Sequence, residues 1–278
     1  MVLLLAVGAF YARSVLMGGS GNSLANGVHI PGTDLVIGGP ATTSKGTGSG
    51  IPSSWPPVPS DARTTPLGRP PAKASSSTEY SFIQTVDSPT GTRPVAWDPC
   101  RPIHLVVNNA HAPADSDKLL QEATARVGAA TGLKFVIDGP TTEMPSTDRA
   151  PKDRARYGNR WSPVLVAWTD PTTVPQLEGT VAGLAGPDGA PYFDTDQEHW
   201  VSGSMNLDGP QLSAALRRPT GWNISRAIVM HELGHLVGLE HVTSRNELMY
   251  AETTGRTDFG SGDREGLRQL GLGPCFSK

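Results

Sequence analysis

The stretch HELGHLVGLEH, residues 231–241, places three histidines and one glutamate at fixed offsets. In a helix, His231 and His235 lie one turn apart on the same face, so both imidazoles can bind one metal ion. The carboxylate of Glu232 then reaches a metal-bound water without replacing a ligand. Gly238 allows the helix to end in a left-handed turn, and the turn brings His241 back as a third nitrogen ligand.

Three neutral imidazole nitrogens with an open fourth position are typical of a catalytic zinc site, whereas a structural site is closed by a fourth protein ligand. The alternative is that these are ordinary histidines on a helix, since HExxH also occurs by chance. The added glycine and third histidine make such an accident much rarer. Met249 follows shortly afterwards in HVTSRNELMY, where a turn would form the floor of the site.

HELGHLVGLEH followed by ELMY resembles the metzincin metallopeptidases, and within them the matrixins. The segments GTVAGLAGP (179–187) and YFDTDQEHW (192–200) are also similar to matrixin segments, and the resemblance covers roughly residues 95–275. It implies one catalytic zinc bound by His231, His235 and His241, with Glu232 as the catalytic base and Met249 as the Met-turn.

The sequence departs from the matrixin pattern at several positions. The first 99 residues contain no cysteine, so the cysteine-switch propeptide of animal matrixins cannot operate. Tyr192 stands where those enzymes tend to have a histidine for a second, structural zinc. Tyr250 directly follows Met249, whereas astacin-like relatives place a metal-contacting tyrosine two positions later, so we leave Tyr250 out of the ligand set. An acidic turn nearby supplies candidate calcium ligands or is merely solvated: Asp194, Asp196 and Glu198.

The elements that must position this site predict an α+β domain. The apolar and β-branched runs predict strands over 101–109, 133–138, 162–168, 179–189 and 200–208. Residues 162–168 are nearly all apolar and therefore central. Helices are expected over 115–128, capped by Asp115, over 225–239, capped by Asn223 or Ser225, and over 261–270. The resemblance implies a zincin-like fold with a mixed, mostly parallel twisted sheet, a long active-site helix and a C-terminal helix.

Composition divides the chain into three parts. Residues 1–17 begin with an apolar run that is short for a bilayer span of about 20 residues, and no basic stretch precedes it. We interpret this segment as an export signal or membrane anchor, because a buried strand or helix would have no neighbouring domain to pack against. Residues 18–79 are rich in Gly, Ser and Pro and predict a flexible linker. Residues 80–278 form the globular peptidase domain.

The net charge and the cysteine content indicate which partners the protein binds and in which compartment it lies. The net charge is -3 with no basic cluster, so no nucleic-acid partner is expected. Cys100 and Cys275 are the only cysteines. In an exported chain they would form one disulfide, and in the cytosol they would be free buried thiols. We expect a monomer that is secreted or membrane-anchored through its N-terminus, with the catalytic domain extracellular.

The predicted function is a zinc endopeptidase that hydrolyses extracellular or cell-surface proteins through a zinc-bound water activated by Glu232. The substrate peptide would lie extended along an edge strand. The residues expected in that strand are Val181, Ala182, Gly183 and Leu184. The alternative is a non-catalytic, zinc-containing binding module tethered at the cell surface. The presence of Glu232 argues against it, since a structural site needs the ligands but not the base.

Overall fold

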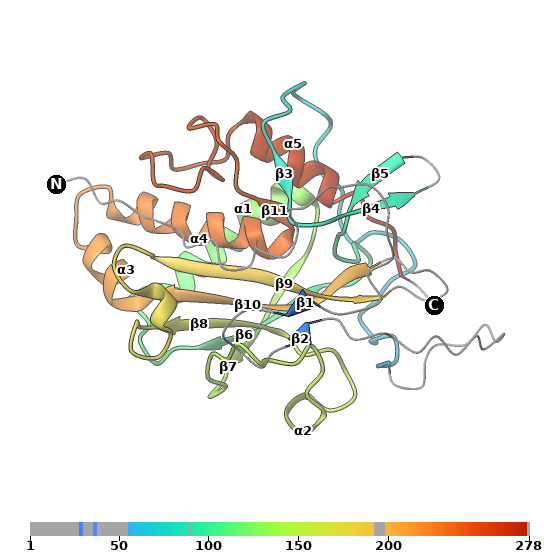
Figure 1. The fold of residues 1–278 in the computed structure, drawn as a ribbon, viewed down its shortest axis with the longest axis horizontal. Coiled ribbons are helices and arrows are strands. Elements are labelled where there is room, and N and C mark those ends of the chain that lie inside the picture. Colours follow the sequence, from blue (N-terminus) through green and yellow to red (C-terminus); the bar gives the residue numbers. More distant parts are fainter. Residues whose placement is uncertain (1–27, 30–35, 38–54, 89–90, 192–197, 277–278) are drawn as a thin grey trace.

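A five-stranded mixed sheet forms the centre of the computed structural model, which describes residues 28–29, 36–37, 55–88, 91–191 and 198–276 (Figure 1). In order across the sheet, the strands are β7 (Phe135–Pro140), β6 (Ile103–Asn108), β8 (Val164–Thr169), β10 (Glu198–Asp208) and β9 (Gly183–Pro191). Four strands run parallel, and β9 is antiparallel to β10. Every residue of the central strand β8 is buried. The predicted α+β class with a mostly parallel sheet is confirmed.

Long helices cover one face of the sheet. They are α1 (Ser116–Thr131), α4 (Gly221–Val237) and α5 (Ser261–Leu270), which lie on the same side of the sheet in Figure 1. The shorter elements are α3 (Gly209–Leu216), the 3-10 turn Pro175–Leu177, and α2 (Arg154–Tyr157) on the opposite side. Leu233 and Leu236 of α4 are fully buried against the same core as Leu119 of α1. This packing fixes the helix that carries the first two histidines.

Two helices differ from the sequence prediction at their ends, whereas α5 has the predicted bounds. Helix α1 continues to Thr131, and Asp115 adopts a left-handed conformation (φ 60°) with no side-chain cap bond. Helix α4 begins at Gly221, before the caps predicted at Asn223 or Ser225. Its first turn is held by a tertiary contact, because Trp222 Nε1 donates to a carboxylate oxygen of Glu122 on α1 at 3.0 Å.

The other face of the sheet is covered by the loop 141–163, which includes α2. Tyr157 packs against a small apolar cluster on this face, formed by Val106, Leu165 and Ala167. The loop is fixed by Arg149, whose side chain is 6% exposed and pairs with Glu143 at 2.8 Å. Arg149 also donates to Ser202 Oγ and to the carbonyl of Gly203 on β10. A buried arginine thus joins the loop to β10.

Residues 55–79, here called the strap, lie against the domain, although the sequence predicts them as part of the flexible linker 18–79. The ring of Trp55 packs edge-on against Trp161 with centroids 5.3 Å apart. The backbone N–H of Arg63 donates to Cys100 O at 2.8 Å, and that of Leu67 donates to Pro99 O at 2.9 Å. The composition of this segment suggested that the entropy cost of ordering it would keep it flexible. These contacts offset that cost. The strap therefore packs on the domain that the sequence predicts to begin at residue 80.

Short strand pairs complete the fold. They are β1 (Val28–His29) with β2 (Val36–Ile37), β3 (Ser81–Phe82) with β11 (Leu239–Glu240), and β4 (Thr85–Ser88) with β5 (Gly91–Pro94). Residues 1–17 lie outside the described residues. Among the helices that the structure describes, none combines the length and apolar character needed to cross a membrane.

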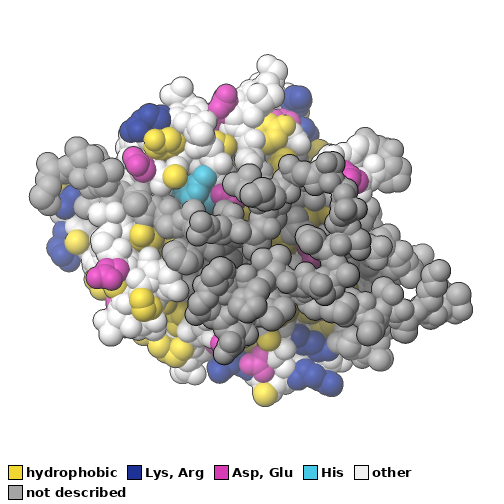
Figure 2. Space-filling view, in the orientation of Figure 1, with side chains coloured by type: hydrophobic (Ala, Val, Ile, Leu, Met, Phe, Trp, Pro, Cys, Tyr) yellow, Lys and Arg dark blue, Asp and Glu magenta, His cyan; other side chains and the backbone are white. Residues whose placement is uncertain are grey.

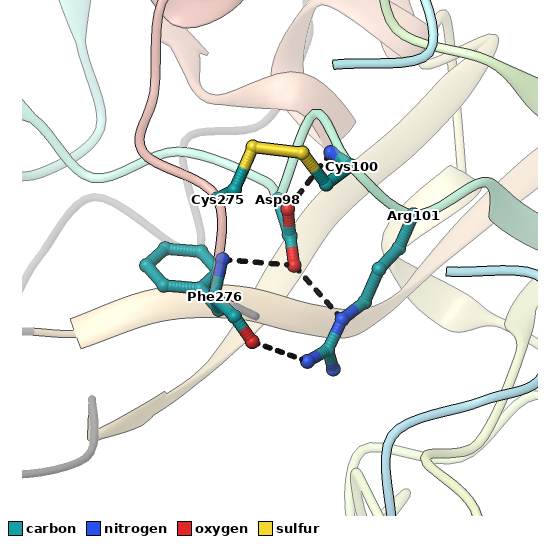
Figure 3. Close-up of a disulfide and its surroundings, with 5 residues drawn as sticks. All are labelled: Asp98, Cys100, Arg101, Cys275 and Phe276. Carbon is teal, nitrogen blue, oxygen red and sulfur yellow. Dashed lines mark hydrogen bonds and ion pairs between the residues drawn. A yellow bond between two sulfur atoms is a disulfide. The ribbon is translucent and has the colours of Figure 1, made fainter. Parts of the chain in front are cut away.

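A disulfide joins Cys100, just before β6, to Cys275, after α5, with their Cα atoms 5.3 Å apart (Figure 3). The carboxylate of Asp98 lies beside it and accepts hydrogen bonds from the backbone N–H groups of Cys100 and Phe276. Arg101 pairs with Asp98 at 2.8 Å and donates to the Phe276 carbonyl. The end of the chain is therefore held to the start of the sheet both covalently and by charge.

Candidate active site

Helix α4 and the turn after it bring the three predicted histidines together. His231 and His235 project from one face of α4, which ends at Gly238 with φ 120°, a conformation that favours glycine. The Gly238 N–H donates to Gly234 O and His235 O, and β11 then leads to His241. The three Nε2 atoms lie 3.1–3.2 Å from one another.

The second ring nitrogen of each α4 histidine fixes its tautomer. His231 Nδ1 lies 2.7 Å from Leu248 O, and His235 Nδ1 lies 2.9 Å from Leu239 O. A carbonyl oxygen only accepts, so both Nδ1 atoms carry the proton and both Nε2 lone pairs face the common centre. Lone pairs at this distance repel each other unless they share a cation.

The donor set fits a zinc ion. Zinc–nitrogen bonds of about 2.0–2.1 Å in tetrahedral geometry separate the ligand atoms by about 3.3 Å, close to the spacing here. Burial, with a smaller contribution from His241, lowers the pKa of His231 to about 4. Burial also lowers the pKa of His235 and of His241. All three rings are therefore neutral near pH 7, the form that binds metal.

Glu232 lies beside these ligands in a nearly closed environment. Its side chain is 1% exposed, and Oε2 has no hydrogen-bond partner among the described residues. Burial raises the pKa of Glu232 to about 8. The side chain packs on Gly183 of β9, where an added Cβ would lie 2.6 Å from Glu232 Cγ. Only glycine leaves room for the carboxylate at this position.

Met249 lies directly under α4. Its Sδ is 2.6 Å from the point where a Cβ on Gly234 would lie, so the sulfur packs against the helix between the two histidine turns. The loop is held by Asp263 of α5, whose carboxylate accepts from the backbone N–H groups of Leu248 and Met249. The residue predicted as the Met-turn thus packs against α4 at Gly234, between the positions of His231 and His235.

A small cavity of about 40 Å³ opens beside His231 and Glu232. Its apolar walls are Ala182, Ala227, Ile228 and Leu248, and its rim includes Tyr250, Glu252, Thr253 and Arg256. The Tyr250 hydroxyl accepts a hydrogen bond from Arg245 at 3.1 Å. In Figure 2, histidine (cyan) reaches the surface near the position of α4 in Figure 1, next to hydrophobic and acidic side chains.

The strand predicted to bind substrate is shifted along the chain. β9 is the outer strand next to β10, but it begins at Gly183, so Val181 and Ala182 precede it. The side chains of Val181 and Leu184 are buried in a cluster with Val174 and Leu177. Ala182 and Gly183 therefore line the cavity beside Glu232, whereas the side chains of Val181 and Leu184 do not face it.

Of the other residues that the sequence singles out, Tyr192, Asp194 and Asp196 lie outside the described residues. Glu198 Oε2 accepts from Gln84 at 2.5 Å, and Glu198 belongs to none of the possible metal-binding groups among the described residues. Calcium is not supported. Sequence reasoning missed the Leu239 and Leu248 carbonyls, the Gly183 contact and Asp263. Backbone carbonyls carry no sequence signal, and Asp263 was visible only as an acidic residue in the first turn of a predicted helix.

Residues 169–270 match the family model of the matrixin peptidases (peptidase M10). Among solved structures, the chain is similar to archaemetzincin from Methanopyrus kandleri, with 17% identity and a TM-score of 0.31, over 59% of this chain and 84% of that chain. No curated protein sequence matches the chain. Over residues 169–270 the family match confirms the matrixin resemblance that the histidine motif predicts, and it suggests zinc metallopeptidase activity.

Proposed function

We propose that this chain is a zinc-dependent endopeptidase that cleaves extracellular or cell-surface proteins. The observation that carries the proposal is the convergence of three Nε2 atoms within 3.2 Å, beside a buried carboxylate and a cavity at the sheet edge. His231, His235 and His241 would hold a zinc ion, which would supply Lewis acidity toward a carbonyl oxygen and lower the pKa of a bound water.

Glu232 is the proposed proton carrier. Its burial gives it a pKa near neutrality, which suits a group that both accepts and releases a proton in each cycle. It takes a proton from the attacking water and delivers it to the nitrogen of the leaving amine. The absence of a side chain at Gly183 leaves space for the carboxylate in the position where it lies.

Substrate binding is assigned to β9 and the cavity. An extended peptide gains backbone hydrogen bonds along an outer strand, and such pairing needs no free chain end, so it suits an endopeptidase. The cavity beside Glu232 is lined by Ala182, Ala227 and Ile228, so it offers apolar contacts to a substrate side chain. Cleavage sites are therefore expected to carry an apolar residue next to the hydrolysed bond.

The rival function is a non-catalytic binding module that uses zinc for stability. A buried carboxylate without a partner costs folding free energy, and a module of this kind would gain nothing by keeping it. Glu232 is in that costly position, which favours the peptidase.

Export is also part of the proposal. The disulfide between Cys100 and Cys275 suits an oxidising compartment. The apolar run within residues 1–17 suits a signal or membrane anchor. Both features favour a secreted or anchored monomer with its site outside the cell.

The test separates metal binding from catalysis. Purified wild type should contain about one zinc and cleave a peptide library. Glu232→Gln should keep the zinc and the fold but lose activity on the order of 10²-fold or more, because only the base is removed. His235→Ala should lose both zinc affinity and activity. Hydrolysis by Glu232→Gln at the wild-type rate would instead favour the binding module.

A further inference from the structure

The strand pair β3–β11 lies directly beside the proposed metal centre, although its two strands are far apart in sequence. β11 is the connection between the second and third histidines, and it pairs antiparallel with β3. Phe82 stands opposite Leu239, and the Ile83 N–H donates to Gly238 O at 3.0 Å. A segment outside the histidine motif thus contacts the motif through its backbone.

This pairing orients the Leu239 carbonyl, which accepts the hydrogen bond from His235. In an antiparallel ladder, hydrogen-bonded and non-hydrogen-bonded positions alternate. Because Ile83 donates to Gly238, the next position, Leu239, is non-hydrogen-bonded, and its carbonyl points away from β3. That carbonyl receives the hydrogen bond from His235 Nδ1 at 2.9 Å. β3 therefore sets the direction of the bond that fixes the tautomer and ring plane of the second ligand.

The same pairing holds the residue before the third ligand. Ser81 stands opposite Glu240. The Glu240 carboxylate accepts from the backbone N–H of His241 at 2.8 Å and lies 3.6 Å from His241 Nδ1. A displacement of β11 would therefore move both His235 and His241 relative to His231.

β3 is itself fixed by α5. The Tyr80 hydroxyl accepts from Gln269 Nε2 at 2.7 Å. Tyr80 and Leu239 both pack on Gly266, where an added Cβ would lie 3.0 Å from Tyr80 Cβ and 2.7 Å from Leu239 Cδ2. Tyr80, Leu239 and α5 thus fit together with no room for another atom at Gly266.

We infer that residues 81–83 position two metal ligands, so that this N-terminal segment sets the metal affinity of a centre to which it donates no ligand. The inference rests on the proposed function in one respect, that the centre binds zinc. The residues act on the metal only through Leu239 and Glu240, so they are positioning residues and not catalytic ones.

The test is zinc affinity of the full chain, measured by competition with a chelator. Ile83→Pro removes the N–H that bonds Gly238 and should weaken zinc binding about 10- to 100-fold, the usual effect of disturbing the partners of metal ligands. When cobalt replaces zinc, the visible absorption spectrum of Ile83→Pro should also differ from that of the wild type. Ile83→Val keeps the N–H and should bind zinc as wild type does. Leu165→Ala, in the apolar cluster on the far face, controls for loss of stability and should leave zinc affinity unchanged.

A second variant keeps the test decisive if Ile83→Pro does not fold. Gly266→Ala pushes on Leu239 and Tyr80 without touching a ligand, and it should also weaken zinc binding. Wild-type zinc affinity and cobalt spectrum in the folded variants would overturn the positioning role while leaving the metal centre intact. Absence of zinc binding by the wild type would instead overturn the proposed function, and the inference with it.

Discussion

At the scale of single residues, neighbouring side chains in the motif have different tasks. His231 and His235 offer Nε2 lone pairs because their Nδ1 atoms donate to backbone carbonyls, whereas Glu232 has an oxygen with no partner among the described residues. The difference arises from direction, since residues one position apart on a helix face different surroundings. Position 232 faces β9 and the cavity.

Gly183 provides a residue-scale prediction. Gly183→Ala places a Cβ 2.6 Å from Glu232 Cγ, so the carboxylate must move. Zinc content should stay at the wild-type level, while peptidase activity should fall on the order of 10²-fold, as expected when a catalytic group is misplaced by about 1 Å. Gly189→Ala on the same strand is the control, because its Cβ would contact Trp200 instead of Glu232. Full activity of Gly183→Ala would show that Glu232 need not stay where the structure places it.

The sequence predicts the histidine cluster because the spacing of the ligands is local. One helical turn separates His231 from His235, and Gly238 permits the turn that returns His241. Leu239 and Leu248 act through carbonyl oxygens that every residue possesses, so no pattern marks them. Gly183 meets Glu232 only through the packing of β9 on α4, a contact that spacing along the chain does not encode.

At the scale of elements, prediction succeeded where local signals agree. The nearly all-apolar run 162–168 predicted a central strand, and β8 lies in the middle of the sheet. Helix α5 has its predicted bounds. Helix α4 starts earlier than predicted because Trp222 is bound to α1, and β3 was not predicted because its partner β11 lies far along the chain. Tertiary contacts override local preference at these places.

The buried pair Arg149–Glu143 provides an element-scale prediction. Arg149→Leu leaves the Glu143 carboxylate largely buried without its cation and should lower the free energy of unfolding by about 3–5 kcal/mol. Urea denaturation measures this change. Arg156→Leu in the same loop is the control, because Arg156 is 43% exposed and its pair should be worth at most about 1 kcal/mol. Equal effects of the two substitutions would show that Arg149 does not hold the loop to the sheet.

At the scale of the whole molecule, the strap extends the domain beyond its predicted start. His104 on β6 joins the strap to the sheet, with Nε2 2.8 Å from Asp61 and Nδ1 2.6 Å from Asp138. Burial alone would lower the pKa of His104, but the hydrogen bonds to Asp138 and Asp61 outweigh it and raise the pKa. Protonation of His104 is thus coupled to docking of the strap.

This coupling predicts a pH dependence. Since the folded pKa of His104 is above the unfolded value of about 6.5, its stabilisation is complete below about pH 6.5 and is lost as pH rises through the folded pKa. The free energy of unfolding should therefore differ more between wild type and His104→Gln at about pH 6 than at about pH 9. His111→Gln is the control, because His111 lies 3.5 Å from a single carboxylate. A difference that grows toward pH 9 would contradict the assignment.

The disulfide between Cys100 and Cys275 also determines whether the fragments of a cleaved chain separate during purification. It joins cysteines separated by 175 positions in the sequence, and the loop that it closes contains the whole histidine motif and Met144, which is 53% exposed. A peptidase that cuts its own chain once inside this loop yields two fragments that remain covalently joined. Such a nicked molecule runs as a single species on a gel without reductant and separates only after reduction. Comparing the two gels therefore reveals self-cleavage that a non-reducing gel conceals.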